Sequence, residues 1–224
     1  MITWNKTPIQ ALTSFKDFAR NATLYVPQGS IDAYKEAYDW KDFKEIKEIK
    51  ENISISSNGI ATYNSTHDLD FSEVENVRAY IVSAFQPKKG EVALTRVYEV
   101  PAGMGLVLIG KEGEYEIPLG TGKAMVSNLL VGINETTTLK ATEDDRTNFI
   151  LPENQEEAAF RAVTNEVELS FGKAYLPLPT ESVALLEDGK LTLHFADPSL
   201  GDVDGDGYVK ISDVTTLVNI ILGK

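Results

Sequence analysis

The clearest evidence for the fold lies in the segment Val92-Ala-Leu-Thr-Arg-Val-Tyr-Glu-Val-Pro-Ala-Gly-Met-Gly-Leu-Val-Leu-Ile109. Its first part, Val92–Val97, alternates apolar and polar side chains, which is typical of a β-strand with one buried face. Pro101-Ala-Gly103 is a turn signal. Leu106–Ile109 is a short continuous apolar run, which predicts a buried strand. The segment therefore predicts a strand, a turn and a second strand that is buried more deeply.

The same pattern extends over residues 51–197. Val167–Phe171 and Leu191–Phe195 also alternate, and turns rich in glycine or proline separate the runs. Short strands punctuated in this way are typical of an antiparallel β-sandwich or barrel, here with at least about eight strands. The pattern of Glu153–Arg161 allows one short helix within this all-β domain.

The first fifty residues have a different, mixed α/β pattern. Thr23–Val26 is β-rich and stops at Pro27-Gln-Gly29, and Ser30 then suits a helix N-cap. Ile31, Tyr34 and Tyr38 would share one face of that helix. We therefore expect residues 1–50 to form a separate N-terminal unit.

The run from Ala22 to Ile46 resembles the C-terminal cap of BspA-like leucine-rich repeat proteins, which are bacterial surface proteins. No leucine-rich repeat recurs here, although such a solenoid needs several repeats to bury its core. The resemblance implies that the chain is cut from a longer protein. Four segments of the all-β domain also resemble a β module that accompanies these proteins and has no assigned activity: Gly59–Tyr63, Leu69–Phe71, Val100–Gly103 and Gly172–Leu176.

The last part of the chain, residues 198–224, has the spacing of a calcium loop followed by a helix. Oxygen ligands at positions 1, 3, 5, 7 and 12 of an EF-hand-type loop surround one calcium ion, and a glycine at position 6 allows the sharp turn. Gly207 occupies that glycine position, and the apolar residues from Val214 to Leu222 form one stripe of a helix. The predicted calcium ligands are Asp202, Asp204, Asp206, the carbonyl of Tyr208, and Asp213.

Asp197-Pro198 before this loop disfavours an entering helix, so the motif is a loop and one helix. This arrangement resembles one repeat of a type I dockerin, the calcium-dependent module that docks secreted proteins onto cohesin domains. Dockerins normally carry two repeats, whereas this sequence shows one, and their usual Asn at the ninth loop position is Lys210. The resemblance implies Ca²⁺ as a cofactor and a cohesin-type partner, and the missing repeat argues against docking by this repeat alone.

Composition restricts the kinds of partner. The chain has 34 acidic and 21 basic residues, a net charge of −13 and no cysteine. Nucleic acid and anionic membranes need concentrated positive charge, which the sequence does not display. The chain has no apolar run of about 18 residues and no signal-peptide pattern at Met1, so we expect no membrane insertion. A calcium loop suits a calcium-rich environment, which favours the mature part of a secreted or cell-surface protein.

The sequence offers little for catalysis. The two histidines, His67 and His194, lie in a predicted turn and on the polar face of a predicted strand. Paired carboxylates for glycoside hydrolysis could arise from many acidic residues and leave that class open. Seven aromatic residues could stack on sugars, although most of them are better explained as core residues: Trp4, Trp40, Tyr63, Tyr80, Tyr98, Tyr115 and Tyr175.

We therefore expect no enzyme activity, and a secreted or cell-surface binding or adhesion protein whose ligand is a host surface or a glycan. The alternative is a fragment or an accessory carbohydrate-binding module of a glycoside hydrolase. An aromatic-lined groove with two carboxylates at its floor would favour that alternative.

Overall fold

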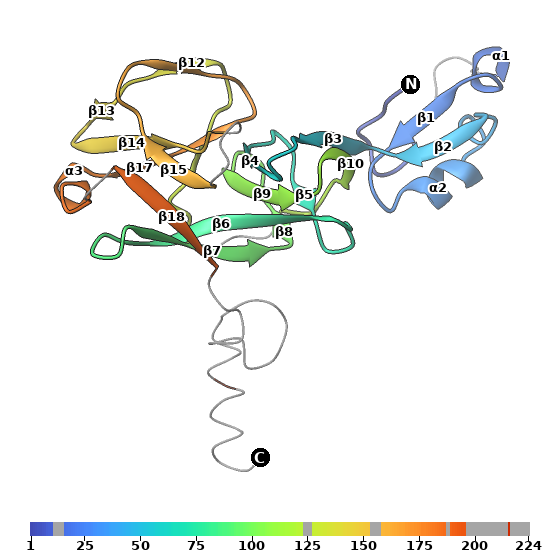
Figure 1. The fold of residues 1–224 in the computed structure, drawn as a ribbon. Coiled ribbons are helices and arrows are strands. Elements are labelled where there is room, and N and C mark those ends of the chain that lie inside the picture. Colours follow the sequence, from blue (N-terminus) through green and yellow to red (C-terminus); the bar gives the residue numbers. More distant parts are fainter. Residues whose placement is uncertain (11–15, 123–126, 153–157, 187–188, 196–214, 216–224) are drawn as a thin grey trace, which may run out of the picture.

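The computed structural model describes residues 1–10, 16–122, 127–152, 158–186, 189–195 and 215. The protein is mainly β, and its short helices lie outside the sheets (Figure 1). The N-terminal elements are α1 (Lys16–Ala19), β1 (Thr23–Val26), α2 (Ile31–Glu36) and β2 (Glu45–Glu48). The β-rich part begins with β3 (Lys50–Ile55), β4 (Ile60–Tyr63), β5 (Leu69–Asp70), β6 (Val77–Gln86), β7 (Glu91–Val97), β8 (Glu99–Val100), β9 (Leu106–Gly110) and β10 (Gly113–Pro118). It continues with β11 (Val131–Gly132), β12 (Thr137–Leu139), β13 (Thr142–Glu143), β14 (Arg146–Ile150), β15 (Ala159–Ala162), β16 (Val167–Leu169), β17 (Ala174–Pro179), α3 (Thr180–Val183) and β18 (Lys190–Phe195).

A ten-stranded sheet forms the body of the β-rich part. Its order is β11-β17-β14-β15-β18-β7-β6-β9-β4, and β13 pairs with β14. Its neighbouring strands are antiparallel except β18 and β7, which run parallel. The prediction of an antiparallel sandwich or barrel-like domain with many short strands is therefore confirmed.

The two ends of this sheet approach each other and nearly close a barrel. The Asn64 amide donates to the Gly172 carbonyl at 2.7 Å, and the Ala174 amide donates to Thr62 Oγ1 at 3.3 Å. The Asn64 side-chain Nδ2 donates to the Ile133 carbonyl at 3.1 Å. We call this set (Thr62, Asn64, Ile133, Gly172 and Ala174) the seam. Individual hydrogen bonds, several of them from side chains, thus replace a regular strand ladder where β4 meets the opposite end of the sheet.

Four strands, β4, β9, β6 and β7, form a central wall that is buried on both faces. One face contributes Leu108 of β9 and Ile81 of β6 to a first core, which β3, β5, β8 and β10 cover. The other face contributes Val107 and Val82 to a second core, which β14, β15, β17 and β18 cover. Because both faces are buried, the sequence of β9 is continuously apolar, as predicted for Leu106–Ile109.

The N-terminal unit has its own small core, made by Ala19, Leu24, Val26, Tyr34, Trp40 and Phe43. Its strands β1 and β2 pair in parallel, with α2 between them in the chain (Figure 1). The strand predicted at Thr23–Val26 is confirmed. The helix ends at Glu36 and is therefore shorter than the sequence pattern predicted. Tyr38, expected on its buried face, is 68% exposed.

Two further expectations need correction. The helix considered for Glu153–Arg161 is wrong where the structure describes it, because Ala159–Ala162 is a strand that pairs with both β14 and β18. Phe195, expected on the buried face of its strand, is half exposed because β18 extends past the second core. Among the described residues, no helix is long and apolar enough to cross a membrane.

Candidate ligand-binding cleft

A cleft of about 360 Å³ opens between the N-terminal unit and the β-rich part. Pockets of roughly this size at the junction of two structural units are common ligand sites. The N-terminal segment and the loop after β1 form one wall, the loop after β10 forms another, and we call the part lined by β5 and β8 the floor. The lining residues are Trp4, Lys6, Pro27, Gln28, Gly29, Asp70, Glu99, Leu119, Gly120 and Thr121.

Trp4 presents an exposed aromatic face beside this cleft. Its side chain is 57% exposed, and its ring stacks on the imidazole of His67 with centroids 5.1 Å apart and an interplanar angle of 14°. The His67 Nδ1 lies 3.2 Å from Glu51 Oε2, which also accepts a hydrogen bond from Ser65 Oγ at 2.5 Å. The indole is therefore supported from behind by a hydrogen-bonded group on the β-rich part, which limits its motion.

Tyr63 completes the support of Glu51. Its hydroxyl donates a hydrogen bond to Glu51 Oε1, so one carboxylate binds Tyr63, Ser65 and His67 together. Burial raises the pKa of Tyr63, and the hydrogen bond to the Glu51 carboxylate adds to that rise. The phenol consequently remains a neutral donor, and the group beneath Trp4 keeps one arrangement.

Two carboxylates lie side by side on the floor of the cleft. Asp70 and Glu99 are direct partners in the antiparallel pairing of β5 with β8, so their side chains share one face. Asp70 Oδ1 accepts hydrogen bonds from the backbone amide and hydroxyl of Ser72, at 2.8 and 2.5 Å. Thr121 Oγ1 donates to Glu99 Oε2 at 3.0 Å. Like charges placed directly opposite each other destabilise a strand pair, and ligand hydroxyls that donate to both groups would relieve this cost.

The wall formed by the loop after β10 depends on a glycine. The Gly120 amide donates to the Asp68 carbonyl at 2.7 Å, and a Cβ at Gly120 would lie 2.7 Å from the Leu69 carbonyl oxygen. Any other residue would push this loop away from β5. Glycine therefore keeps the Thr121 hydroxyl next to the Glu99 carboxylate.

This combination suits a sugar. The apolar face of a pyranose ring can stack on an exposed aromatic ring, and carboxylates and hydroxyls accept and donate hydrogen bonds to sugar hydroxyls. Among the described residues, neither histidine ring forms a hydrogen bond with a serine hydroxyl. His67 and Ser65 both contact the same Glu51 oxygen, and His194 is exposed on β18, as predicted.

The predicted calcium ligands Asp202, Asp204, Asp206, Tyr208 and Asp213 lie outside the described residues. Within the described part of the chain, no group of three or more His, Asp or Glu side chains could hold a metal ion. The dockerin-like loop therefore stays a prediction from the sequence.

The sequence pattern does not reveal this cleft. Trp4 is one of seven aromatic residues that could stack on a sugar, most of which favour core packing, and the structure exposes its ring. Neither Asp70 nor Glu99 stands out in the sequence. Trp40 and Tyr80, by contrast, are buried as expected. Comparison with known proteins gave no matching family model, no matching curated protein and no matching solved structure.

Proposed function

We propose that this protein is a non-catalytic binding or adhesion protein of a cell surface or of the secreted fraction, and that it holds a glycan in the cleft between its N-terminal unit and its β-rich part. The observation that carries this proposal is the exposed Trp4 ring, supported by His67, beside a floor that presents Asp70 and Glu99. The ring would stack on a sugar, while the carboxylates and the Thr121 hydroxyl would bind its hydroxyl groups.

The test is binding of the intact chain to a glycan array, followed by calorimetry with the glycan that binds best. Trp4→Ala should raise the Kd for that glycan roughly tenfold or more, since exposed tryptophans at the centre of a binding site are common hot spots. Phe171→Ala is a matched control, because Phe171 is a similarly exposed aromatic at 53% and does not line the cleft. Equal effects of the two substitutions, or no glycan binding, would refute the proposal.

A fragment or an accessory carbohydrate-binding module of a glycoside hydrolase is the second candidate, and the Asp70 and Glu99 pair favours the hydrolase fragment. Hydrolysis needs two carboxyl groups about 5 to 10 Å apart around the scissile bond. Incubation of the bound oligosaccharide with the protein separates the two functions. We expect no release of reducing ends; release that is lost in Glu99→Gln would assign hydrolysis to this pair.

Calcium binding by residues 198–224 is part of the same proposal. Four aspartates confined to a short loop repel one another unless a divalent ion neutralises them. The resemblances to a leucine-rich repeat cap and to a dockerin repeat support a surface location and raise a cohesin-type partner. Titration of the chain with a cohesin domain, with and without calcium, tests that partner, and we expect no tight complex because only one repeat is present.

A further inference from the structure

A second hollow, of about 670 Å³, lies at the open end of the second core. Its lining includes two arginines and a lysine together with aromatic and aliphatic side chains, namely Arg78, Tyr80, Arg96, Ile109, Lys111 and Phe195. These residues come from β6, β7, β9 and β18 and from the turn after β9, so no single stretch of sequence displays the cluster.

The strand register places most of these residues on one face of the sheet. Tyr80 is the direct partner of Arg96, and Arg78 is the direct partner of Ile109. Tyr80 belongs to the second core and is 8% exposed, whereas Arg78 two residues earlier is exposed. The face that is apolar and buried inside the barrel therefore becomes cationic and open at this end.

The cations of this hollow have no carboxylate partner within the described part of the chain. None of Arg78, Arg96 and Lys111 forms an ion pair there, and none of the described Asp and Glu residues lines the hollow. Arg96 instead lies over the ring of Tyr98, with 4.6 Å from Cζ to the ring centroid. In a protein with a net charge of −13, a cluster of three cations without a carboxylate among its described neighbours is a local reversal of sign.

The apolar side of the hollow is also arranged for contact. The ring of Phe195 is 50% exposed and meets Tyr80 edge to face, with centroids 5.4 Å apart and an interplanar angle of 70°. Ile109 extends this surface. The hollow thus joins a flat apolar surface to guanidinium groups, which bind carboxylates in a planar, bidentate geometry.

We propose that this hollow binds an acidic sugar, with the ring against Phe195 and Ile109 and the carboxylate on Arg78 and Arg96. A long polyanion such as nucleic acid would meet repulsion from the rest of this acidic protein, so a short ligand with one carboxylate per ring fits better. The site is separate from the Trp4 cleft and shares no residue with it.

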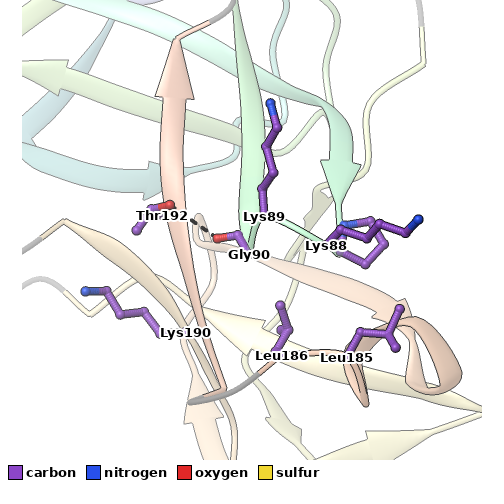
Figure 2. A pocket seen from close by; sticks show the side chains of 8 residues that line it. Lys88, Lys89, Gly90, Leu185, Leu186, Lys190 and Thr192 are labelled. Atoms are coloured by element: carbon purple, nitrogen blue, oxygen red, sulfur yellow. Dashed lines mark hydrogen bonds between the residues drawn. The ribbon is translucent and has the colours of Figure 1, made fainter.

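The lysine-rich hollow at the other end of β6 supplies a control. Lys88, Lys89 and Lys190 line that hollow of about 420 Å³. Figure 2 shows that their side chains point away from one another, while Thr192 Oγ1 donates to the Gly90 carbonyl at 3.2 Å. Diverging lysines do not converge on one anion, although they carry as much charge.

The experiment is calorimetry of the full chain with trigalacturonic acid and with its methyl ester, which lacks the charge but keeps the ring. We expect binding of the acid, at least tenfold weaker binding of the ester, and weakening of acid binding as salt increases. Arg78→Gln and Arg96→Gln should each reduce affinity roughly tenfold or more. The double variant Lys88→Gln/Lys89→Gln and the variant Trp4→Ala should leave acid binding unchanged.

Thermal melting confirms that each variant is folded, and Arg78→Gln is the safer substitution because Arg78 is exposed. The proposal is overturned if the acid does not bind or if the ester binds equally well. It is also overturned if the lysine double variant loses as much affinity as Arg78→Gln, or if a single-stranded oligonucleotide binds more tightly than the trisaccharide. Loss of neutral-glycan binding in Trp4→Ala with acid binding intact would show that the two sites stand independently.

Discussion

The central wall makes a specific prediction about cooperativity. Val107 and Leu108 are adjacent on β9, but Val107 packs in the second core and Leu108 in the first. The two side chains are 0% and 1% exposed. Truncating either one to alanine leaves a cavity on one face of the same strand. Because the strand cannot separate from one core and keep the other, both truncations should destabilise a single unfolding unit.

The size of the effect follows from burial. Leu→Ala at a buried site costs about 2–5 kcal/mol, and Val107→Ala removes two methyl groups, which gives about 2 kcal/mol. For a chain of this length each kcal/mol lowers Tm by roughly 2–4 °C. Leu108→Ala should therefore lower Tm by roughly 4–20 °C, and Val107→Ala by roughly 4–8 °C.

The assay is urea unfolding followed by far-UV circular dichroism and by tryptophan fluorescence. We expect both variants to shift the main dichroism transition without changing its slope. Trp40 lies in the core of the N-terminal unit and Trp4 stacks on His67 of the β-rich part, so the fluorescence transition reports on that unit and on its contact with the β-rich part. A biphasic dichroism curve for Leu108→Ala, with only part of the β signal shifted, would show that the two cores unfold separately and that the wall does not couple them.

Three further predictions concern individual groups. Burial and the Glu51 hydrogen bond raise the pKa of Tyr63, so the stability that its neutral phenol contributes is present below the unfolded pKa of about 10 and is lost as the pH rises further. Urea titration of the wild type and of Tyr63→Phe at about pH 8 and about pH 11 should therefore give a smaller difference in free energy of unfolding at the higher pH, and a constant difference would contradict the mechanism. Gly132→Ala should cost roughly 1–3 kcal/mol in urea unfolding, because its Cβ would overlap Asn64 Oδ1 and lie 2.7 Å from the Gly103 carbonyl, and an unchanged midpoint would mean that the seam can relax. Asp213→Ala should weaken calcium binding more than alanine at the other predicted loop positions, because it removes the closing ligand; calorimetry in calcium-free buffer measures this, and no binding by the wild type would disprove the site.

Local pattern was sufficient to predict two strands of the central wall. Val92–Val97 lies in β7 and Leu106–Ile109 lies in β9, and β9 is apolar throughout because both its faces are covered. Val77–Gln86, which pairs with both of them, is not among the predicted strands. Ala159–Ala162 shows the limit. It pairs on one side with Arg146–Ile150 and on the other with Lys190–Phe195, about thirty residues later, and this pairing on both sides overrides local propensity.

The candidate cleft was harder to predict for the same reason. Asp70 and Glu99 become neighbours only through the register of two very short strands, which carry no periodic signal of their own. Trp4 lies before the first helix or strand, and its position depends on stacking against His67, which is distant in the sequence. The polar residues around it, Thr3, Asn5 and Lys6, are the one sequence signal that indicates an exposed position for Trp4.

The position of β18 has a consequence for the order in which the protein assembles. It is the last strand described, yet it lies in the middle of the sheet, between β15 and β7, with Thr192 beside Glu91. The buried members of the first core all fall between Ile53 and Ile117, so that core can form while the ribosome is still making the rest. The second core is complete only with Leu191, so its half of the wall stays partly uncovered until that residue emerges. The time needed to synthesise the roughly eighty residues between the end of β9 and Leu191 therefore sets how long this nascent chain depends on protection from other chains.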